Sequence, residues 1–438
     1  MSELPPLVRL AIPLAMQQVG FQLMGVVDAA MLGRYSDAAL AGAGVGNNLL
    51  FGIVSIGLGI IMGMDTVVPQ ALGAGRIDDA RRAVGAGVRL AVLVGLVATL
   101  VVFATPIILD LADVQPEVIA EARPYLYLRA VGVVPFLITV ALRSYLAANG
   151  RTRPMIVAVT AGNLANALLD VLLIFGVSAI GLPALGVLGA ALATTIVQLL
   201  ILTVYALGVV ALDSEVKEPR PPSTVADLVA IARYGGPVGG QIFAEVGIFG
   251  VATVIAAHLG KIPAAAHAIA LNISSLTFSF AVGVASATSV RVGLAVGAGD
   301  LATARRRGLL GVKLGLGVMA CFAAAFVLTP AAIASAFTDR AEVIAATVPL
   351  LQIAAVFQLS DGTQAVGAGA LRGLGRTGAT LWGNLVGHYV VGLPIILALG
   401  FTAGLGIAGV WWGLSAGLAV TALYLVWTFL RSTSRTRR

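Results

Sequence analysis

The stretch GAGRIDDARR at residues 73–82 occurs again as GAGDLATARR at residues 297–306, and this recurrence decides the fold. Other landmarks recur in the same order: Pro13 with Gln17 returns as Pro237 with Gln241, GRT at 150–152 returns at 375–377, and GNL at 162–164 returns at 383–385. The two copies stay 221–225 residues apart along the whole chain. Matches at a nearly constant spacing indicate an internal duplication.

The composition places both copies in a membrane. Hydrophobic residues make up 59% of the 438 residues, charged residues 11%, and the mean hydropathy is +1.00, whereas soluble domains carry about 25% charged residues. A bilayer core needs about 20 apolar residues per helix. The sequence divides into twelve such runs, at 10–33, 45–68, 83–109, 125–148, 155–177, 184–211, 231–257, 266–290, 308–336, 349–371, 378–400 and 404–430. We therefore predict an all-α polytopic membrane protein with twelve transmembrane helices.

A charged, proline-rich segment, DSEVKEPRPPST at residues 213–224, lies at the midpoint of the chain. This composition is typical of a linker, so we expect an N-terminal domain at 1–212 and a C-terminal domain at 225–438. Each domain contains six helices, and an even number returns the chain to the same side of the membrane. The sequence therefore predicts two parallel six-helix bundles related by an axis along the membrane normal.

Several function classes are excluded by the residue inventory. The one cysteine, Cys321, rules out internal disulfides and cysteine metal centres. None of the three lysines belongs to a Gly-Lys-Ser/Thr phosphate-binding loop. The net charge is +7, but no basic stretch is interleaved with aromatic residues. We expect neither an enzyme nor a nucleic-acid binder, and no cofactor.

The basic residues predict the orientation, because loops rich in arginine and lysine stay in the cytoplasm. With the N-terminus inside, most of the 27 basic residues fall on the cytoplasmic side. The opposite side receives Arg34, Arg123, Arg129, Lys261 and Arg340. We predict a multi-pass protein of the cell inner membrane with both termini in the cytoplasm.

Acidic residues inside the apolar runs are the candidate functional groups: Asp28, Asp65, Asp170, Glu245 and Asp361. A charged aspartate at a helix centre costs about 2.5–3.5 kcal/mol, and such residues usually face the protein interior as ion or proton sites. Asp65 is the exception, because it lies near the inner end of its helix, where it can pair with an arginine.

The other acids form one pair in each half. Asp28 and Asp170 lie at similar depth, and Asn166 precedes Asp170 by one helical turn. Glu245 and Asp361 both lie near the middle of their helices in the second half. Oxygen-rich pairs bind hard cations such as Na⁺, whereas like-charge proximity favours proton uptake. Both Na⁺ and H⁺ remain candidate coupling ions, with Asp28, Asp170, Glu245 and Asp361 as candidate Na⁺ ligands.

The chain resembles the multidrug and toxic compound extrusion (MATE) transporters, in particular their NorM/DinF-like bacterial branch. The likeness covers essentially the whole chain. It is carried by QQVG at 17–20 leading to Asp28, by GRY at 33–35 with Asn47, by VPQALGAGR at 68–76, and by NALLD at 166–170 followed by IFG at 174–176.

This resemblance implies a secondary antiporter that exports organic, often cationic, compounds in exchange for Na⁺ or H⁺ by alternating access. It implies that Asp28, Asn166 and Asp170 form the family's N-lobe coupling site, and that Glu245 and Asp361 match the C-lobe acids. Phe357 departs from the pattern, since parts of the branch have tyrosine there. The resemblance also leads us to expect a monomer in the lipid bilayer.

Small organic substrates need contacts as well, and we take Gln17, Met24, Gln241 and Phe357 as candidate substrate-binding residues. Methionine adapts its shape to varied ligands. Two other functions stay open: a flippase for lipid-linked precursors, which would need a strongly cationic cavity, and an ion channel, which would conduct without stoichiometric exchange. The intramembrane acids argue against the first, and the duplication within one chain argues against a symmetric pore.

Overall fold

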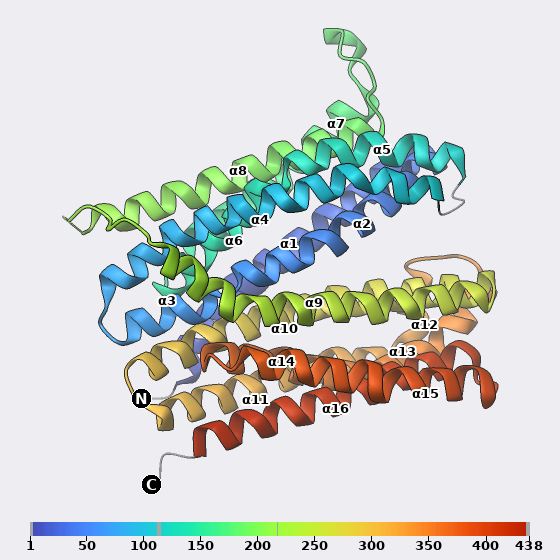
Figure 1. Ribbon diagram of the computed structural model, residues 1–438. Coiled ribbons are helices and arrows are strands. Elements are labelled where there is room, and N and C mark those ends of the chain that lie inside the picture. The colour runs from blue at the N-terminus through green and yellow to red at the C-terminus, as the bar shows by residue number, and fades with distance from the viewer. Residues whose placement is uncertain (1–2, 112–114, 217, 435–438) are drawn as a thin grey trace. The chain divides into compact units, whose positions relative to one another are not determined.

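The computed structural model describes residues 3–111, 115–216 and 218–434, and the chain is almost entirely helical over these ranges (Figure 1). Four basic residues used in the orientation prediction lie outside the described residues: Lys217, Arg435, Arg437 and Arg438. The helices of the first repeat are α1 (Leu4–Tyr35), α2 (Asp37–Ile61), α3 (Met64–Gly73), α4 (Ile77–Leu111), α5 (Pro116–Val131), α6 (Val133–Ala148), α7 (Arg153–Phe175), η1 (Ser178–Ile180) and α8 (Val187–Ser214).

The second repeat continues with the same succession of long helices, divided more finely near the end of the chain. Its elements are α9 (Val225–His258), α10 (Lys261–Gly297), α11 (Leu301–Leu328), α12 (Pro330–Ser335), α13 (Ala341–Gly373), α14 (Thr377–Asn384), η2 (Leu385–Gly392), α15 (Leu393–Leu397), η3 (Ala398–Thr402) and α16 (Gly406–Ser434).

The predicted membrane class and helix number are confirmed. Eleven helical segments in the described residues are long and apolar enough to cross a membrane. The pair α5 and α6 passes the same test when taken together, with a bend of 44° between them. Counting this bent pair as one span gives twelve, and each of the twelve predicted runs falls on one of these segments.

Besides the fourth span, which is bent between α5 and α6, three spans depart from the continuous α-helices that the sequence predicted. The second is divided between Ile61 and Met64 into α2 and α3. The ninth, predicted to reach residue 336, ends at Leu328, and Thr329 leaves the helical region with φ −133° and ψ 39°. The reason is Pro330, because a proline disfavours helical geometry in the residue before it. The eleventh span contains two π-helical segments, η2 and η3.

By its internal contacts the chain forms two compact units. The N-terminal unit contains Met16–Val68 and Arg76–Gly239, and the C-terminal unit contains Met1–Ala15, Pro69–Gly75 and Gly240–Arg438. The predicted linker is held within the N-terminal unit, where Arg81 Nη2 donates to Glu218 O at 2.7 Å and Arg89 Nη1 donates to Ser223 O at 3.0 Å. The predicted domains, 1–212 and 225–438, remain a prediction.

Close backbone packing holds the N-terminal unit together. α7 packs against α8, α2 against α5, and α4 against α6. A Cβ atom added to Gly59 would lie 2.2 Å from the backbone of Gly239, and one added to Gly235 would lie 1.8 Å from Ile60 O. Small residues let membrane helices approach this closely, so larger side chains cannot fit there without displacing a helix.

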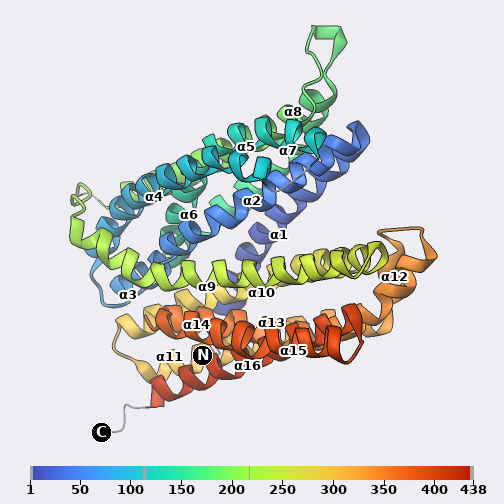
Figure 2. The same ribbon diagram turned by 45° about the vertical axis from the view of Figure 1, so that its right-hand side comes forward.

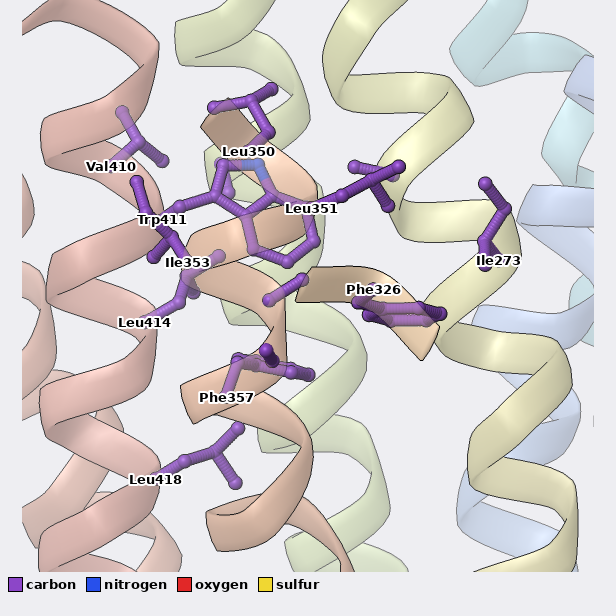
Figure 3. Packing of buried hydrophobic residues seen from close by; sticks show 14 of the residues in the cluster. Ile273, Phe326, Leu350, Leu351, Ile353, Phe357, Val410, Trp411, Leu414 and Leu418 are labelled. Carbon is purple, nitrogen blue, oxygen red and sulfur yellow. The ribbon is translucent and has the colours of Figure 1, made fainter. Parts of the chain in front are cut away.

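The C-terminal unit is built around α13, which packs against α10, α11 and α16 (Figure 1, Figure 2). Its core contains an aromatic contact between Phe357 of α13 and Trp411 of α16, with ring centroids 5.5 Å apart (Figure 3). Aliphatic side chains such as Leu350, Leu414 and Leu418 fill the space around these rings. This packing fixes α13, the helix that carries Asp361.

Candidate functional site

Asp28 and Asp170, the acid pair predicted in the first half, lie together in the N-terminal unit. Asp28 on α1 is half-buried and accepts hydrogen bonds on both oxygens. Asn166 Nδ2 of α7 donates to Oδ1 at 2.9 Å, and Thr194 Oγ1 of α8 lies 2.9 Å from Oδ2. The Thr194 hydroxyl has one hydrogen, which it shares between Asp28 and the carbonyl of Ala190 at 3.0 Å.

Asp170 completes this group from one turn further along α7, on the same face as Asn166. Its side chain is fully buried, and neither carboxylate oxygen accepts a hydrogen bond from an N–H or a hydroxyl among the described residues. Its electrostatic partner is Asp28, and the two carboxyl groups can hydrogen-bond to each other when one holds a proton. The site therefore combines two acids, an amide and a hydroxyl from three helices.

Tyr125 of α5 is a further neighbour of this group. Its ring is 4% exposed and interacts electrostatically with Asp28, Asp170 and Arg129. A Cβ atom on Gly46 would lie 2.8 Å from this ring. Sequence reasoning missed Tyr125 and Thr194, because an aromatic or a threonine in an apolar helix gives no signal of what it faces.

The acids predicted in the second half lie together in the C-terminal unit. Glu245 of α9 accepts two hydrogen bonds on the same oxygen, Oε1: one from Gln241 Nε2 at 3.1 Å and a short one from Gln364 Nε2 of α13. Asp361, 7% exposed and one turn before Gln364, interacts electrostatically with Glu245. Gln241, predicted as a substrate contact, is thus a partner of the acid one turn beyond it.

Two residues that the sequence analysis did not single out also act on Glu245. Asn384 of α14 and the positive charge of Arg372 in the last turn of α13 both interact electrostatically with its carboxylate. Both residues are more than 90% buried. Arg372 follows Asp361 by three turns, and the sequence alone does not reveal that its charge reaches α9.

The remaining predicted residues are buried at separate places. Gln17 is 3% exposed and Met24 is 5% exposed in the N-terminal unit, with Met24 Cε close to Gly162. Phe357 is 2% exposed and packs against Trp411 (Figure 3). The ring centroid of Phe249 lies 6.1 Å from that of Phe357. Phe357 precedes Asp361 by one turn, and its ring lies in the hydrophobic core of the C-terminal unit.

Asp65, predicted as a structural acid at a helix end, has the partners expected for that role. Ser144 Oγ donates to Oδ1 at 2.6 Å, and Arg143 Nη2 lies 3.7 Å from Oδ2. Among the described residues, no three or more histidine, cysteine, aspartate or glutamate side chains come together in a cluster able to hold a metal ion.

A duplicated helical membrane protein with one intramembrane acid pair in each unit has the architecture of a membrane transporter built from two repeats. The MatE family model matches residues 13–172 and again residues 237–397. The two matches begin at Pro13 and Pro237, which are among the landmarks that indicate the duplication. The chain belongs to the multidrug and toxic compound extrusion (MATE) family and to its NorM-like bacterial branch.

Similar proteins cover nearly the full length. A probable multidrug resistance protein NorM of Pseudomonas putida is 37% identical, with 98% of this chain and 94% of the relative covered. A protein of the same name from Deinococcus radiodurans is 35% identical, with 99% and 96% covered. The crystal structure of the eukaryotic MATE transporter AtDTX14 shares 20% identity at a TM-score of 0.90, covering 99% of this chain and 98% of that chain.

Proposed function

We propose that this protein is a secondary active multidrug efflux antiporter that exports organic, often cationic, compounds in exchange for Na⁺ or H⁺ by alternating access. The names of its relatives support the substrate class, since they are described as multidrug resistance proteins. The observation that carries the coupling proposal is the Asp28–Asp170 pair, with its amide and hydroxyl partners.

The chemistry of this pair suits exchange. Two carboxylates close together in a low-dielectric site repel each other, so one proton or one Na⁺ between them relieves the repulsion. Asn166 and Thr194 hold Asp28 in place by its two oxygens, and Asp170 offers two oxygens that accept no other donor among the described residues. An ion that binds this arrangement in one state of the transporter more tightly than in the other drives the change between them.

Glu245 and Asp361 form a second cation site in this proposal. Gln241 and Gln364 both occupy Oε1 of Glu245, and Arg372 supplies a nearby positive charge. Arg372 already offsets part of the negative charge in the C-terminal unit, and we accordingly assign the main coupling role to the N-terminal pair.

The candidate substrate contacts are proposed from their positions along the helices that carry the acids. Met24 precedes Asp28 by one turn of α1, so a cationic compound touching the Met24 side chain would lie beside that carboxylate. Gln241 likewise precedes Glu245 by one turn of α9, so a compound touching Gln241 would lie beside the Glu245 carboxylate. Gln17 and Phe357 complete the proposed set of substrate contacts. We also propose that the protein lies in the cell inner membrane as a monomer, with both termini in the cytoplasm.

The decisive test replaces Asp28 with asparagine, which keeps the size of the side chain and removes its charge. We expect Asp28→Asn to abolish dye efflux from proteoliposomes driven by an imposed Na⁺ or H⁺ gradient while dye binding persists. Asp37→Asn is the matched control, since it makes the same change at the exposed start of α2. Full gradient-driven efflux by Asp28→Asn would show that the coupling proposal is wrong.

The same efflux assay shows whether Na⁺ or H⁺ is the coupling ion. Efflux that stops in sodium-free buffer and survives an uncoupler assigns Na⁺, whereas efflux that needs only the proton gradient assigns H⁺. Dye movement without either gradient dependence would instead indicate facilitated diffusion and overturn the antiport proposal.

A further inference from the structure

The start of α1 is attached to the C-terminal unit, although its sequence belongs to the first repeat. Glu3, directly before α1, places its carboxylate between two arginines of the second repeat. Arg307 of α11 donates from Nε to Oε2 at 3.0 Å and from Nη2 to Oε1 at 3.3 Å. Arg291 of α10 makes a short contact with Oε2. One acid thereby joins three segments of the C-terminal unit.

The two arginines are also joined directly, because Arg307 Nη1 donates to the backbone carbonyl of Arg291 at 3.1 Å. All three side chains of this group are less than one-third exposed. Geometry in which one guanidinium contacts both oxygens of a carboxylate is more specific than a single surface contact. We call Glu3, Arg291 and Arg307 the arginine clamp.

A second contact fixes the same segment of α1 further along. A Cβ atom added to Gly283 of α10 would lie 2.5 Å from the Cα atom of Ala15, so the two helix backbones touch at this point. Glu3 meets Arg291 and Ala15 meets Gly283, which shows that this part of α1 runs antiparallel to α10. Residues 4–15 are therefore held to α10 at both ends, by charge at one and by close packing at the other.

The same helix continues to the candidate coupling site. The division between the compact units falls between Ala15 and Met16, and Asp28 lies 13 residues beyond Ala15, or about 20 Å along the helix at 1.5 Å per residue. Pro13 lies inside α1 just before this division. A proline removes a helix hydrogen bond and allows a helix to bend at that place. One continuous helix thus carries an anchor in the C-terminal unit at one end and the Asp28 carboxylate at the other.

The repeat provides an internal comparison. Asp227 stands 224 residues after Glu3, the spacing that also separates Pro13 from Pro237. Its carboxylate accepts hydrogen bonds from the backbone N–H and the hydroxyl of Thr224, both at 2.8 Å, and so caps the start of its own helix. Asp227 thus bonds to the residue just before its own helix, whereas Glu3 binds arginines on two other helices. The arginine clamp is therefore found in the first copy of the repeat and not at the equivalent position of the second.

We propose that Glu3 is a positioning residue whose clamp to Arg291 and Arg307 fixes the start of α1, so that α1 transmits ion occupancy at Asp28 to the C-terminal unit. This inference rests on the proposed coupling role of Asp28. Glu3 touches neither the ion nor the substrate. Its loss affects the rate of the coupled cycle and leaves the binding sites intact.

The test begins with Glu3→Gln, which keeps the shape of the side chain and removes its charge. We expect gradient-driven efflux to fall about three- to tenfold in maximal rate, which corresponds to about 1 kcal/mol, with KM for the substrate unchanged. Asp227→Asn is the matched control and keeps the full rate. An equal loss in both variants, or a change confined to KM, would overturn the clamp.

Charge exchange gives the second readout. Glu3→Arg leaves three arginines together and should transport more slowly than Glu3→Gln. Adding Arg307→Glu restores one acid between two arginines, with the acid now on α11, and should recover most of the rate. If the double variant folds, as judged by size exclusion and substrate binding, but remains as slow as Glu3→Arg, the clamp is wrong.

Comparison with Asp28→Asn separates this inference from the proposed function. An inactive Asp28→Asn beside a normal Glu3→Gln would refute the clamp alone. A fully active Asp28→Asn would refute the coupling site, and with it the role of α1 in transmitting its occupancy, whatever the Glu3 variants do.

Discussion

The acid pairs of the two units differ in how their charge is compensated. In the N-terminal unit, Asp28 receives one neutral donor on each oxygen, and the electrostatic partner of Asp170 is Asp28 itself. In the C-terminal unit, two amides converge on one oxygen of Glu245, and Arg372 adds a positive charge. Asp28 is the only charged group that acts on Asp170 among the described residues, and a buried carboxylate without a positive partner gains more from binding a cation than one that has such a partner. We therefore propose that efflux depends more strongly on the ion site of the N-terminal unit than on that of the C-terminal unit.

The largest expected effect tests whether Asp28 and Asp170 act as one site. Asp170→Asn and Asp28→Asn should each reduce gradient-driven efflux at least about 100-fold. The double variant should transport no more slowly than either single variant, because the losses caused by two groups that act as a unit do not add. Efflux rates of the three variants in one vesicle preparation decide this. Losses that multiply in the double variant would mean that the two acids work separately.

The next effect compares the C-terminal unit with the N-terminal one. Glu245→Gln should lower the maximal efflux rate about tenfold, less than either aspartate variant, because Arg372 and the amides remain in place. The measurement is again gradient-driven efflux, with expression and thermal stability checked. If Glu245→Gln is as inactive as Asp28→Asn, the two sites are equivalent and the assignment to the N-terminal unit fails.

A finer test concerns the hydroxyl that holds Asp28. Thr194→Val keeps the shape of the side chain and removes the hydrogen bond to Oδ2, so the apparent affinity for the coupling ion should weaken about three- to tenfold, equivalent to one ordinary hydrogen bond. Thr195→Val is the matched control, since its hydroxyl bonds to the Ala191 carbonyl and not to the acid. Equal shifts in both variants would remove Thr194 from the site.

The smallest expected effect is on the stability of the protein and concerns the charge of Glu3. Arg307 and Arg291 lower the pKa of Glu3 below its ordinary value of 4.5. The clamp therefore contributes its stability fully above that ordinary value and loses it as the pH falls through the lowered one. Glu3→Gln should destabilise the protein by no more than about 1 kcal/mol at pH 7.

Thermal unfolding in detergent at pH 7 and at pH 3 measures this difference. The gap between wild type and Glu3→Gln should be smaller at the lower pH, because the wild-type carboxyl takes up its proton as the pH falls through its lowered pKa. A gap that stays constant across this range would show that the charge of Glu3 contributes nothing to stability.

Much of the architecture follows from patterns that depend only on neighbouring residues. Run length and hydropathy predicted every span, because each membrane helix satisfies its own backbone within its segment. The repeat of Pro13 at Pro237 predicted the duplication that the two family matches also mark. Local breaks were harder to predict, and the end of α11 at Leu328 was missed although Pro330 signals it.

The acids of the candidate site could be predicted from the sequence, but the residues that hydrogen-bond to them could not. Asp28 and Asp170 stood out because charge in an apolar run is costly. Thr194 and Gln364 are common polar residues whose importance comes from the helix they face. Phe357, expected at the substrate site, packs against Trp411 in the core of its unit, which only the crossing of α13 and α16 determines.

The sequence by itself determined the membrane class, the twelve spans, the duplication and the acids, since each depends on composition or on spacing along the chain. Only the tertiary structure decided which donors hold each acid and that Glu3 meets Arg291 and Arg307. Hydrogen bonds and ion pairs act over a few ångströms between residues hundreds of positions apart. Helix packing sets those distances, and no periodicity in one segment records which helix lies beside it.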